Sequence, residues 1–137
     1  MPTEAADGNQ NMPHILAIED DAMLLRALVD YLEYTGFKVT QCLYTGADAL
    51  DIGGIHAAGA PLDIILSDFR LPGDNSGIDV IKAVREEFGR DIPAILFTGD
   101  ITRETAASTN GIETAKLLLK PVRMQTLVEE IQALLGA

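Results

Sequence analysis

Side chains that could bind a metal ion and a phosphoryl group end four apolar segments of the sequence. Glu19 and Asp20 end one segment, and Asp68 ends another. Thr98 and Lys120 end two more. If these side chains converge, the three carboxylates need neutralising, and one lysine together with one divalent cation would balance their charge. An all-oxygen ligand set favours Mg²⁺ over zinc or copper.

The chemistry available to such a set is phosphoryl transfer to a carboxylate. A carboxylate beside Mg²⁺ and a lysine can attack a phosphoryl group and form an aspartyl phosphate. The metal and Lys120 would stabilise the transferring group, and Thr98 could hydrogen-bond one of its oxygens. We select Asp68 as the nucleophile because it follows the longest strand-like apolar run. The turn at Leu71 and Pro72 is expected to leave it exposed.

Strand-like and helix-like segments alternate five times along the chain. The expected strands are residues 14–20, 37–42, 62–68, 92–98 and 115–120. The expected helices are residues 24–32 (stopped by Gly36), 45–59, 78–88, 102–110 and 124–135. Apolar strands alternating with amphipathic helices indicate a parallel sheet covered on both faces, which is a doubly wound α/β domain. Ligands bind such sheets outside the carboxyl ends of the strands, where the reactive side chains stand.

Composition excludes several classes of protein. The chain has 137 residues, enough for one core. A net charge of −11 argues against direct nucleic-acid binding. Cys42 is the only cysteine, so no internal disulfide can form. The apolar stretches are too short for a membrane span. Residues 1–13 are expected to form a flexible leader without the features of a secretion signal, before a domain at 14–137, and a cytoplasmic location follows by default.

Four short motifs carry a family resemblance. They are EDD at 19–21, SDFRLPG at 67–73 with the later Gly77, FTGD at 97–100 and LLLKPV at 117–122. Together they resemble the receiver domain of two-component response regulators, over residues 14–136. The resemblance implies a flavodoxin-like sheet with strand order 2-1-3-4-5. It also implies a signalling phosphoacceptor, not a turnover enzyme, whose donor is a histidine kinase or a histidine phosphotransfer protein.

The resemblance also implies a role for each reactive residue. Asp68 matches the phosphoacceptor, and Glu19 and Asp20 match the acidic pair that binds the metal. Thr98 matches the switch hydroxyl, and Lys120 matches the lysine of the family. The backbone carbonyl of Arg70 would complete the metal ligands, and a cis peptide is expected between Lys120 and Pro121.

Some residues depart from the commonest receiver pattern. Glu19 stands where aspartate is more usual. Arg70 and Asp100 each lie two residues beyond a site residue, and we hypothesise that they tune the lifetime of the phosphoryl group. Leu117 occupies a position where many receivers carry an aromatic switch residue.

Other interpretations stay open at this stage. One is a Mg²⁺-dependent phosphatase or phosphotransferase that uses Asp68 on a small substrate. Haloacid-dehalogenase-type enzymes require a second acid two residues after the nucleophile, and Arg70 stands there. Another is a scaffold that works without phosphorylation, against which the intact acids and Lys120 argue. A receiver could stand alone or belong to a hybrid histidine kinase, and its downstream partner is unknown.

Overall fold

The fold is built around a parallel sheet. The computed structural model describes residues 12–73, 76–99 and 114–136. The strands are β1 (His14–Glu19), β2 (Lys38–Leu43), β3 (Ile64–Asp68), β4 (Ala94–Thr98) and β5 (Ala115–Leu119). They are all parallel and lie in the order β2-β1-β3-β4-β5. This order confirms the flavodoxin-like topology that the motifs implied.

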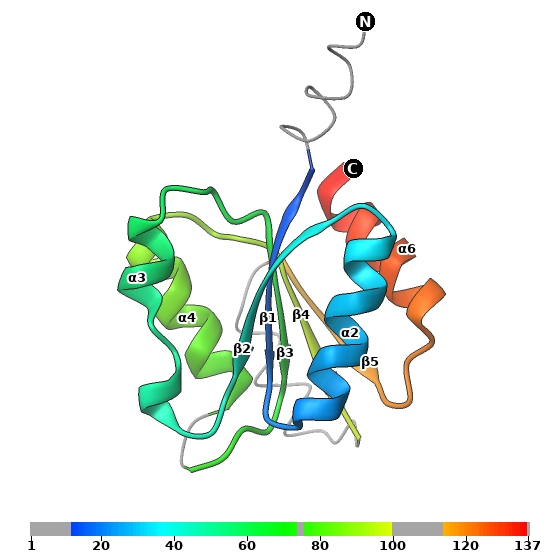
Figure 1. The fold of residues 1–137 in the computed structure, drawn as a ribbon, viewed down its shortest axis with the longest axis horizontal. Helices are drawn as coiled ribbons and strands as arrows, with labels where there is room; N and C mark the ends of the chain where they lie inside the picture. Colours follow the sequence, from blue (N-terminus) through cyan, green and yellow to red (C-terminus); the bar gives the residue numbers. More distant parts are fainter. Residues whose placement is uncertain (1–11, 74–75, 100–113, 137) are drawn as a thin grey trace, which may run out of the picture.

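Helices cover both faces of the sheet (Figure 1). On one side lie α2 (Ala22–Tyr34) and α6 (Met124–Gly136), and on the other lie α3 (Ile52–Ala57) and α4 (Gly77–Phe88). The helix expected at 102–110 lies outside the described residues, as does the leader up to residue 11. The doubly wound α/β prediction is confirmed in the part of the chain that the structure describes.

Local capping residues explain where two of the helices begin and end. Asp21 accepts hydrogen bonds from the backbone N–H groups of Met23 and Leu24 at the start of α2, which satisfies donors that have no partner within the helix. Ser76 begins α4 with a reciprocal capping box. Gly89 ends that helix in the left-handed conformation that glycine adopts without strain.

The single helix expected over residues 45–59 is wrong. The structure has a short 3-10 helix, Ala47–Ala49, followed by α3. Leu50 between them is extended. The side chain of Asp51 then accepts a hydrogen bond from the N–H of Gly54 and starts a new helix. A capping side chain competes with helix continuation, and the two glycines of α3 lower helix propensity further.

The core has one part on each side of the sheet. β1 and β3 are buried along their whole length, whereas the edge strands β2 and β5 are largely part-exposed. Cys42 is buried in β2. β3 is therefore a rigid central strand, and the residue at its carboxyl end is held by packing on both faces.

No helix in the described ranges is long and apolar enough to cross a membrane.

Candidate functional site

The carboxyl ends of the strands enclose a small cavity. It has a volume of about 190 Å³, and its lining includes five of the residues singled out from the sequence: Asp20, Asp68, Arg70, Thr98 and Lys120. They come from the ends of β1, β3, β4 and β5 or from the loops that follow them. Segments far apart in the sequence thus meet at one edge of the sheet, as predicted.

Asp68 is buried at the end of β3. Only 5% of its surface is exposed, so the expectation that the Leu71–Pro72 turn would expose it is wrong. The first residue of α4, Gly77, packs directly against the backbone of Asp68 and donates a hydrogen bond to the carbonyl of Phe69 (2.7 Å). The start of α4 therefore packs against the backbone at the carboxyl end of β3.

Lys120 forms an ion pair with this carboxylate. Its Nζ lies 2.6 Å from Asp68 Oδ1, and its backbone N–H donates to the carbonyl of Thr98 (2.7 Å). The Lys120–Pro121 peptide is cis. Burial by itself lowers the pKa of the Lys120 ammonium, but the close contact with Asp68 and the negative charges around it outweigh burial. The pKa is raised overall, and the lysine stays charged at neutral pH.

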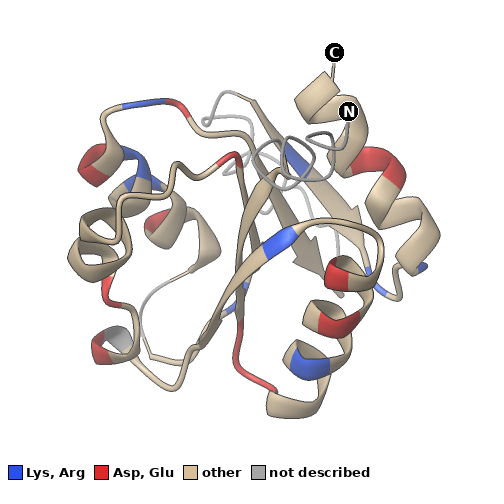
Figure 2. Cartoon of the chain, turned by 45° about the horizontal axis from the view of Figure 1, so that its top comes forward, with Lys and Arg blue, Asp and Glu red and all other residues tan. Residues whose placement is uncertain are grey.

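Glu19 is the second buried acid of the site. Its Oε2 accepts hydrogen bonds from the backbone N–H groups of Asp20 and Asp21, both at 2.9 Å. Burial, followed by its interaction with Asp68, raises the pKa of Glu19 to about 8, although the bond from Asp21 acts in the opposite direction. Figure 2 shows this acidic turn between β1 and α2. The protein therefore holds a proton here that a bound cation would displace.

The donor set fits a hard divalent cation. One carboxylate oxygen from each of Glu19, Asp20 and Asp68 can be chosen so that all lie within 4.8 Å of one another. Asp68 Oδ1 pairs with the Lys120 ammonium at 2.6 Å, and a carboxylate has two oxygens, so the group can be shared between the lysine and a cation. Oxygen ligands with room for water suit Mg²⁺.

We expect the affinity for Mg²⁺ to increase with pH up to about 8. Glu19 must lose its proton to bind the ion, and its pKa is raised from its ordinary value of 4.5 to about 8. The apparent dissociation constant should fall by about tenfold per pH unit below 8 if one proton is released per ion. Calorimetry at pH 6 and pH 8.5, in buffers of different ionisation enthalpy, measures both quantities.

The matched control for this prediction is Glu19→Gln, which keeps the size of the side chain and removes the titration. Binding to this variant should be weaker and nearly independent of pH in the same range.

The same linkage predicts that the metal-free protein loses stability as pH rises from 4.5 to 8, because the folded state binds the Glu19 proton more tightly than the unfolded chain. A pH-independent affinity in the unsubstituted protein would contradict the assignment.

The structure describes two of the three remaining residues that were singled out from the sequence. Thr98 is buried and lines the cavity. Arg70 lines it as well and pairs with Ser76 in an isolated antiparallel bridge. Asp100 lies outside the described residues, so its relation to Arg70 stays a prediction.

A family model decides what kind of domain this is. The model for the response regulator receiver domain matches residues 15–132, which is most of the chain. The chain belongs to this family. Receiver domains are signalling phosphoacceptors that take phosphate from histidine kinases.

Curated relatives agree with the family assignment. The receiver is 31% identical over 122 residues to the uncharacterized transcriptional regulatory protein YkoG of Bacillus subtilis, covering 89% of this chain and 50% of the relative. It is 30% identical to the response regulator receiver protein CpdR of Brucella abortus, covering 92% of this chain and 99% of that protein. PhoB of Escherichia coli is 33% identical, with 88% of this chain and 51% of PhoB covered. The chain thus spans about half the length of YkoG and PhoB.

Solved structures support the same conclusion. A response regulator receiver protein from Sinorhizobium medicae shares 27% identity with a TM-score of 0.75, covering 93% of this chain and 98% of that one. A CheY-like receiver domain from Methanospirillum hungatei has the same TM-score at 22% identity, covering 92% of this chain and 95% of that one. The second likeness shows the fold alone.

Sequence reasoning missed one feature of the receiver site. A second, larger cavity lies beside Glu19, Asp68 and Lys120, with mostly apolar walls. Its walls come from α2, β4 and the start of α6. The spacing of apolar residues within each helix predicts a buried face, but it does not report how far apart two helices stand, so no sequence signal was available.

Proposed function

We propose that this receiver takes a phosphoryl group onto Asp68 in a Mg²⁺-dependent reaction. The observation that carries the proposal is the buried Asp68 carboxylate, which lies between the Lys120 ammonium and two further acids at the mouth of a small cavity. A carboxylate oxygen of Asp68 attacks phosphorus, and the phosphorus–nitrogen bond of a phosphohistidine donor breaks. The departing imidazole takes up a proton.

The residues around Asp68 have separate tasks in this proposal. Lys120 neutralises charge on the phosphoryl oxygens, and the hydroxyl of Thr98 donates a hydrogen bond to one of them. Glu19, Asp20, Asp68 and the backbone carbonyl of Arg70 would hold Mg²⁺. When bound, the ion supplies positive charge that screens the carboxylates from the incoming phosphoryl group.

The donor in this proposal is a histidine kinase or a histidine phosphotransfer protein. Receiver domains take phosphate from histidine kinases, and this chain presents the residues needed to accept it. The receiver then signals to a protein partner through a change in its loops and helices. Leu117 is part-buried against the α4 side of the core, in place of an aromatic side chain. The switch in this protein therefore does not use an aromatic rotamer at that position.

Intact mass spectrometry with a small phosphodonor tests the proposal. Incubation with acetyl phosphate or a phosphoramidate and Mg²⁺ should add one phosphoryl group that is stable to acid and labile to base. Adding EDTA should prevent it. Lack of an adduct under conditions that label a control receiver would falsify the proposal.

We further propose that Arg70 and Asp100 tune the lifetime of the phosphoryl group. Arg70 lines the cavity beside Asp68, and the role we assign to its long side chain is to obstruct the approach of the hydrolytic water. Replacing both residues with alanine should accelerate autodephosphorylation several-fold while labelling still occurs. The loss of phosphoryl group after removal of the donor, followed by intact mass, measures the rate. An unchanged rate in the double variant would rule this role out.

A further inference from the structure

The lysine of the site has to cross a neighbouring strand to reach its carboxylate. In the sheet, β4 lies between β3, which ends at Asp68, and β5, which Lys120 follows. The backbone N–H of Lys120 donates to the carbonyl of Thr98 at the end of β4 (2.7 Å), while its Nζ lies 2.6 Å from Asp68 Oδ1. The aliphatic stem of Lys120 therefore crosses the carboxyl end of β4.

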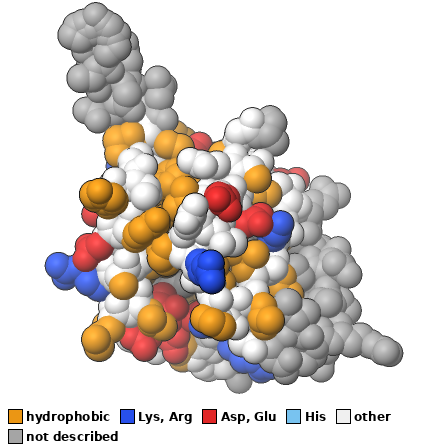
Figure 3. All heavy atoms as spheres, turned by 90° about the vertical axis from the view of Figure 1, so that its right-hand side faces the viewer, with side chains coloured by type: hydrophobic (Ala, Val, Ile, Leu, Met, Phe, Trp, Pro, Cys, Tyr) orange, Lys and Arg blue, Asp and Glu red, His pale blue; other side chains and the backbone are white. Residues whose placement is uncertain are grey.

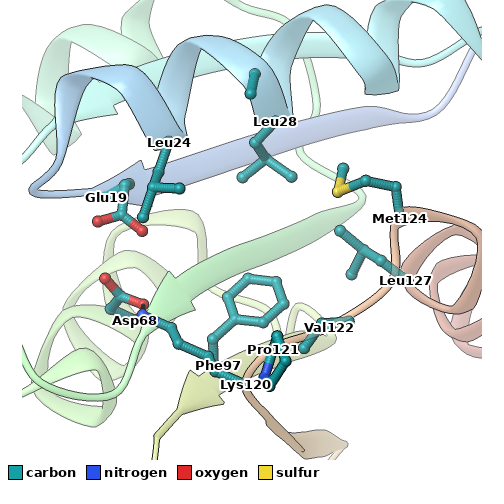
Figure 4. A pocket seen from close by; sticks show the side chains of 11 residues that line it. Glu19, Leu24, Leu28, Asp68, Phe97, Lys120, Pro121, Val122, Met124 and Leu127 are labelled. Carbon is teal, nitrogen blue, oxygen red and sulfur yellow. Dashed lines mark ion pairs between the residues drawn. The ribbon is translucent and has the colours of Figure 1, made fainter.

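Phe97 lies at the point where this stem crosses. It is the last residue but one of β4, and it pairs in register with Asp68. Among the described residues, three line both the small cavity and the larger one, namely Asp68, Phe97 and Lys120. Figure 4 shows the Lys120 side chain passing Phe97 on its way to Asp68. Phe97 is therefore the aromatic residue beside the stem, between its two fixed ends.

The larger cavity leaves this stem next to open space. The cavity has a volume of about 540 Å³, and Figure 3 shows the apolar side chains that gather on this face of the molecule. The Lys120 side chain is 40% exposed. A flexible four-carbon stem takes up many conformations unless a neighbouring group restricts it.

The Phe97 side chain can supply that restriction. It packs against the buried core on the side of the sheet that α2 and α6 cover, so its own position is fixed. The methylene groups of a lysine pack well on apolar surface while the ammonium stays with a polar partner. Packing against Phe97 would leave the Lys120 ammonium directed at Asp68.

We propose that Phe97 is a positioning residue for phosphoryl transfer, whose side chain supports the Lys120 stem over the end of β4 and so keeps the ammonium at Asp68. The inference rests on the proposed function, in which Lys120 neutralises charge on the phosphoryl oxygens. Such stabilisation depends on a charge that is already in place when the reaction begins. A displacement of about 1 Å can slow a reaction by about 100-fold. Phe97 thus acts on the reaction only through Lys120.

Replacing Phe97 with alanine tests the inference by two measurements. In EDTA and without a phosphodonor, NMR measures how fast the ammonium protons of Lys120 exchange with water. This exchange should become several-fold faster in Phe97→Ala, because the unsupported stem lets the ammonium leave Asp68 more often. Labelling by acetyl phosphate with Mg²⁺ should slow by about tenfold. Phe97→Leu keeps a large apolar side chain and should restore both rates to nearly those of the unsubstituted protein.

The matched control is Phe88→Ala, the same change at a part-buried phenylalanine of α4 on the opposite face of the sheet. Phe88 lines neither cavity, so both rates should stay unchanged even if the protein is less stable. Circular dichroism checks that each variant is folded. If Phe97→Ala does not fold, Phe97→Thr takes its place, because threonine favours strands but has no long apolar side chain.

Unchanged ammonium exchange in a folded Phe97→Ala or Phe97→Thr would overturn the inference. Equal changes in the Phe88→Ala control would also overturn it, since they would assign the effect to general destabilisation. If the unsubstituted protein is not labelled at all, the proposed function fails, and the ammonium exchange still decides whether Phe97 positions Lys120.

Discussion

Replacing Asp68 with asparagine is expected to abolish phosphoryl acceptance. The amide has nearly the same size as the carboxylate, so the packing at the end of β3 is preserved, but the amide oxygen is a poor nucleophile at neutral pH. The rate of labelling by acetyl phosphate with Mg²⁺ should fall below detection in intact mass spectra. The Lys120 ammonium then loses its ion pair, since it lies 2.6 Å from the carboxylate that is removed.

The control for this variant is Asp91→Asn, which makes the same change at an exposed acid outside the strands and helices. It should be labelled at the rate of the unsubstituted protein. Circular dichroism should show that both variants keep the α/β fold. Labelling of Asp68→Asn at an unchanged rate would place the phosphoacceptor at another residue and would contradict the reaction proposed here.

A methyl group added at Gly77 is expected to destabilise the protein and misplace the acceptor. The Cβ of an alanine at this position would overlap the backbone carbonyl oxygen of Asp68 and lie 2.6 Å from Leu96 Cδ2. Because backbone of the central strand cannot yield cheaply, either α4 or the end of β3 must shift. We expect Gly77→Ala to lower the free energy of unfolding by about 1–3 kcal/mol. Urea denaturation of the metal-free protein measures this change.

The same variant should also label more slowly, since the displaced strand end carries Asp68. Gly53→Ala is the matched control, because an added Cβ there meets no atom within 4 Å and the residue lies within helix α3. That variant should be stabilised by about 0.5–1 kcal/mol through helix propensity alone. If the two substitutions changed the free energy of unfolding and the rate of labelling equally, close packing against Asp68 would not be the reason that position 77 needs glycine.

Features set by local chain chemistry could be predicted from the sequence. Continuous apolar runs gave the five strands to within two residues at either end, because parallel strands buried on both faces admit few polar residues. Asp21 is a residue type that favours the start of a helix, because its short carboxylate can satisfy free N–H groups, and the structure shows those bonds. The alternation of strands and helices then placed Asp68, Thr98 and Lys120 at one edge of the sheet.

The prediction of one helix over residues 45–59 failed because two local signals compete within that segment. The spacing of apolar residues there is compatible with one helix, but the side chain of Asp51 binds the N–H of Gly54 and restarts the chain. One continuous helix and two short helices are both compatible with the spacing of apolar residues in this segment. α3 also packs against α4, a contact that lies outside the segment and that its local pattern does not report.

The sequence by itself determined which residues could do chemistry here and on which edge of the sheet they meet. Only the tertiary structure decided how deeply Asp68 is buried, how strongly Glu19 holds its proton and how much space separates α2 from α6. The physical reason is that strand and helix periodicities depend on neighbours in the chain, whereas desolvation and cavity volume depend on side chains from distant segments.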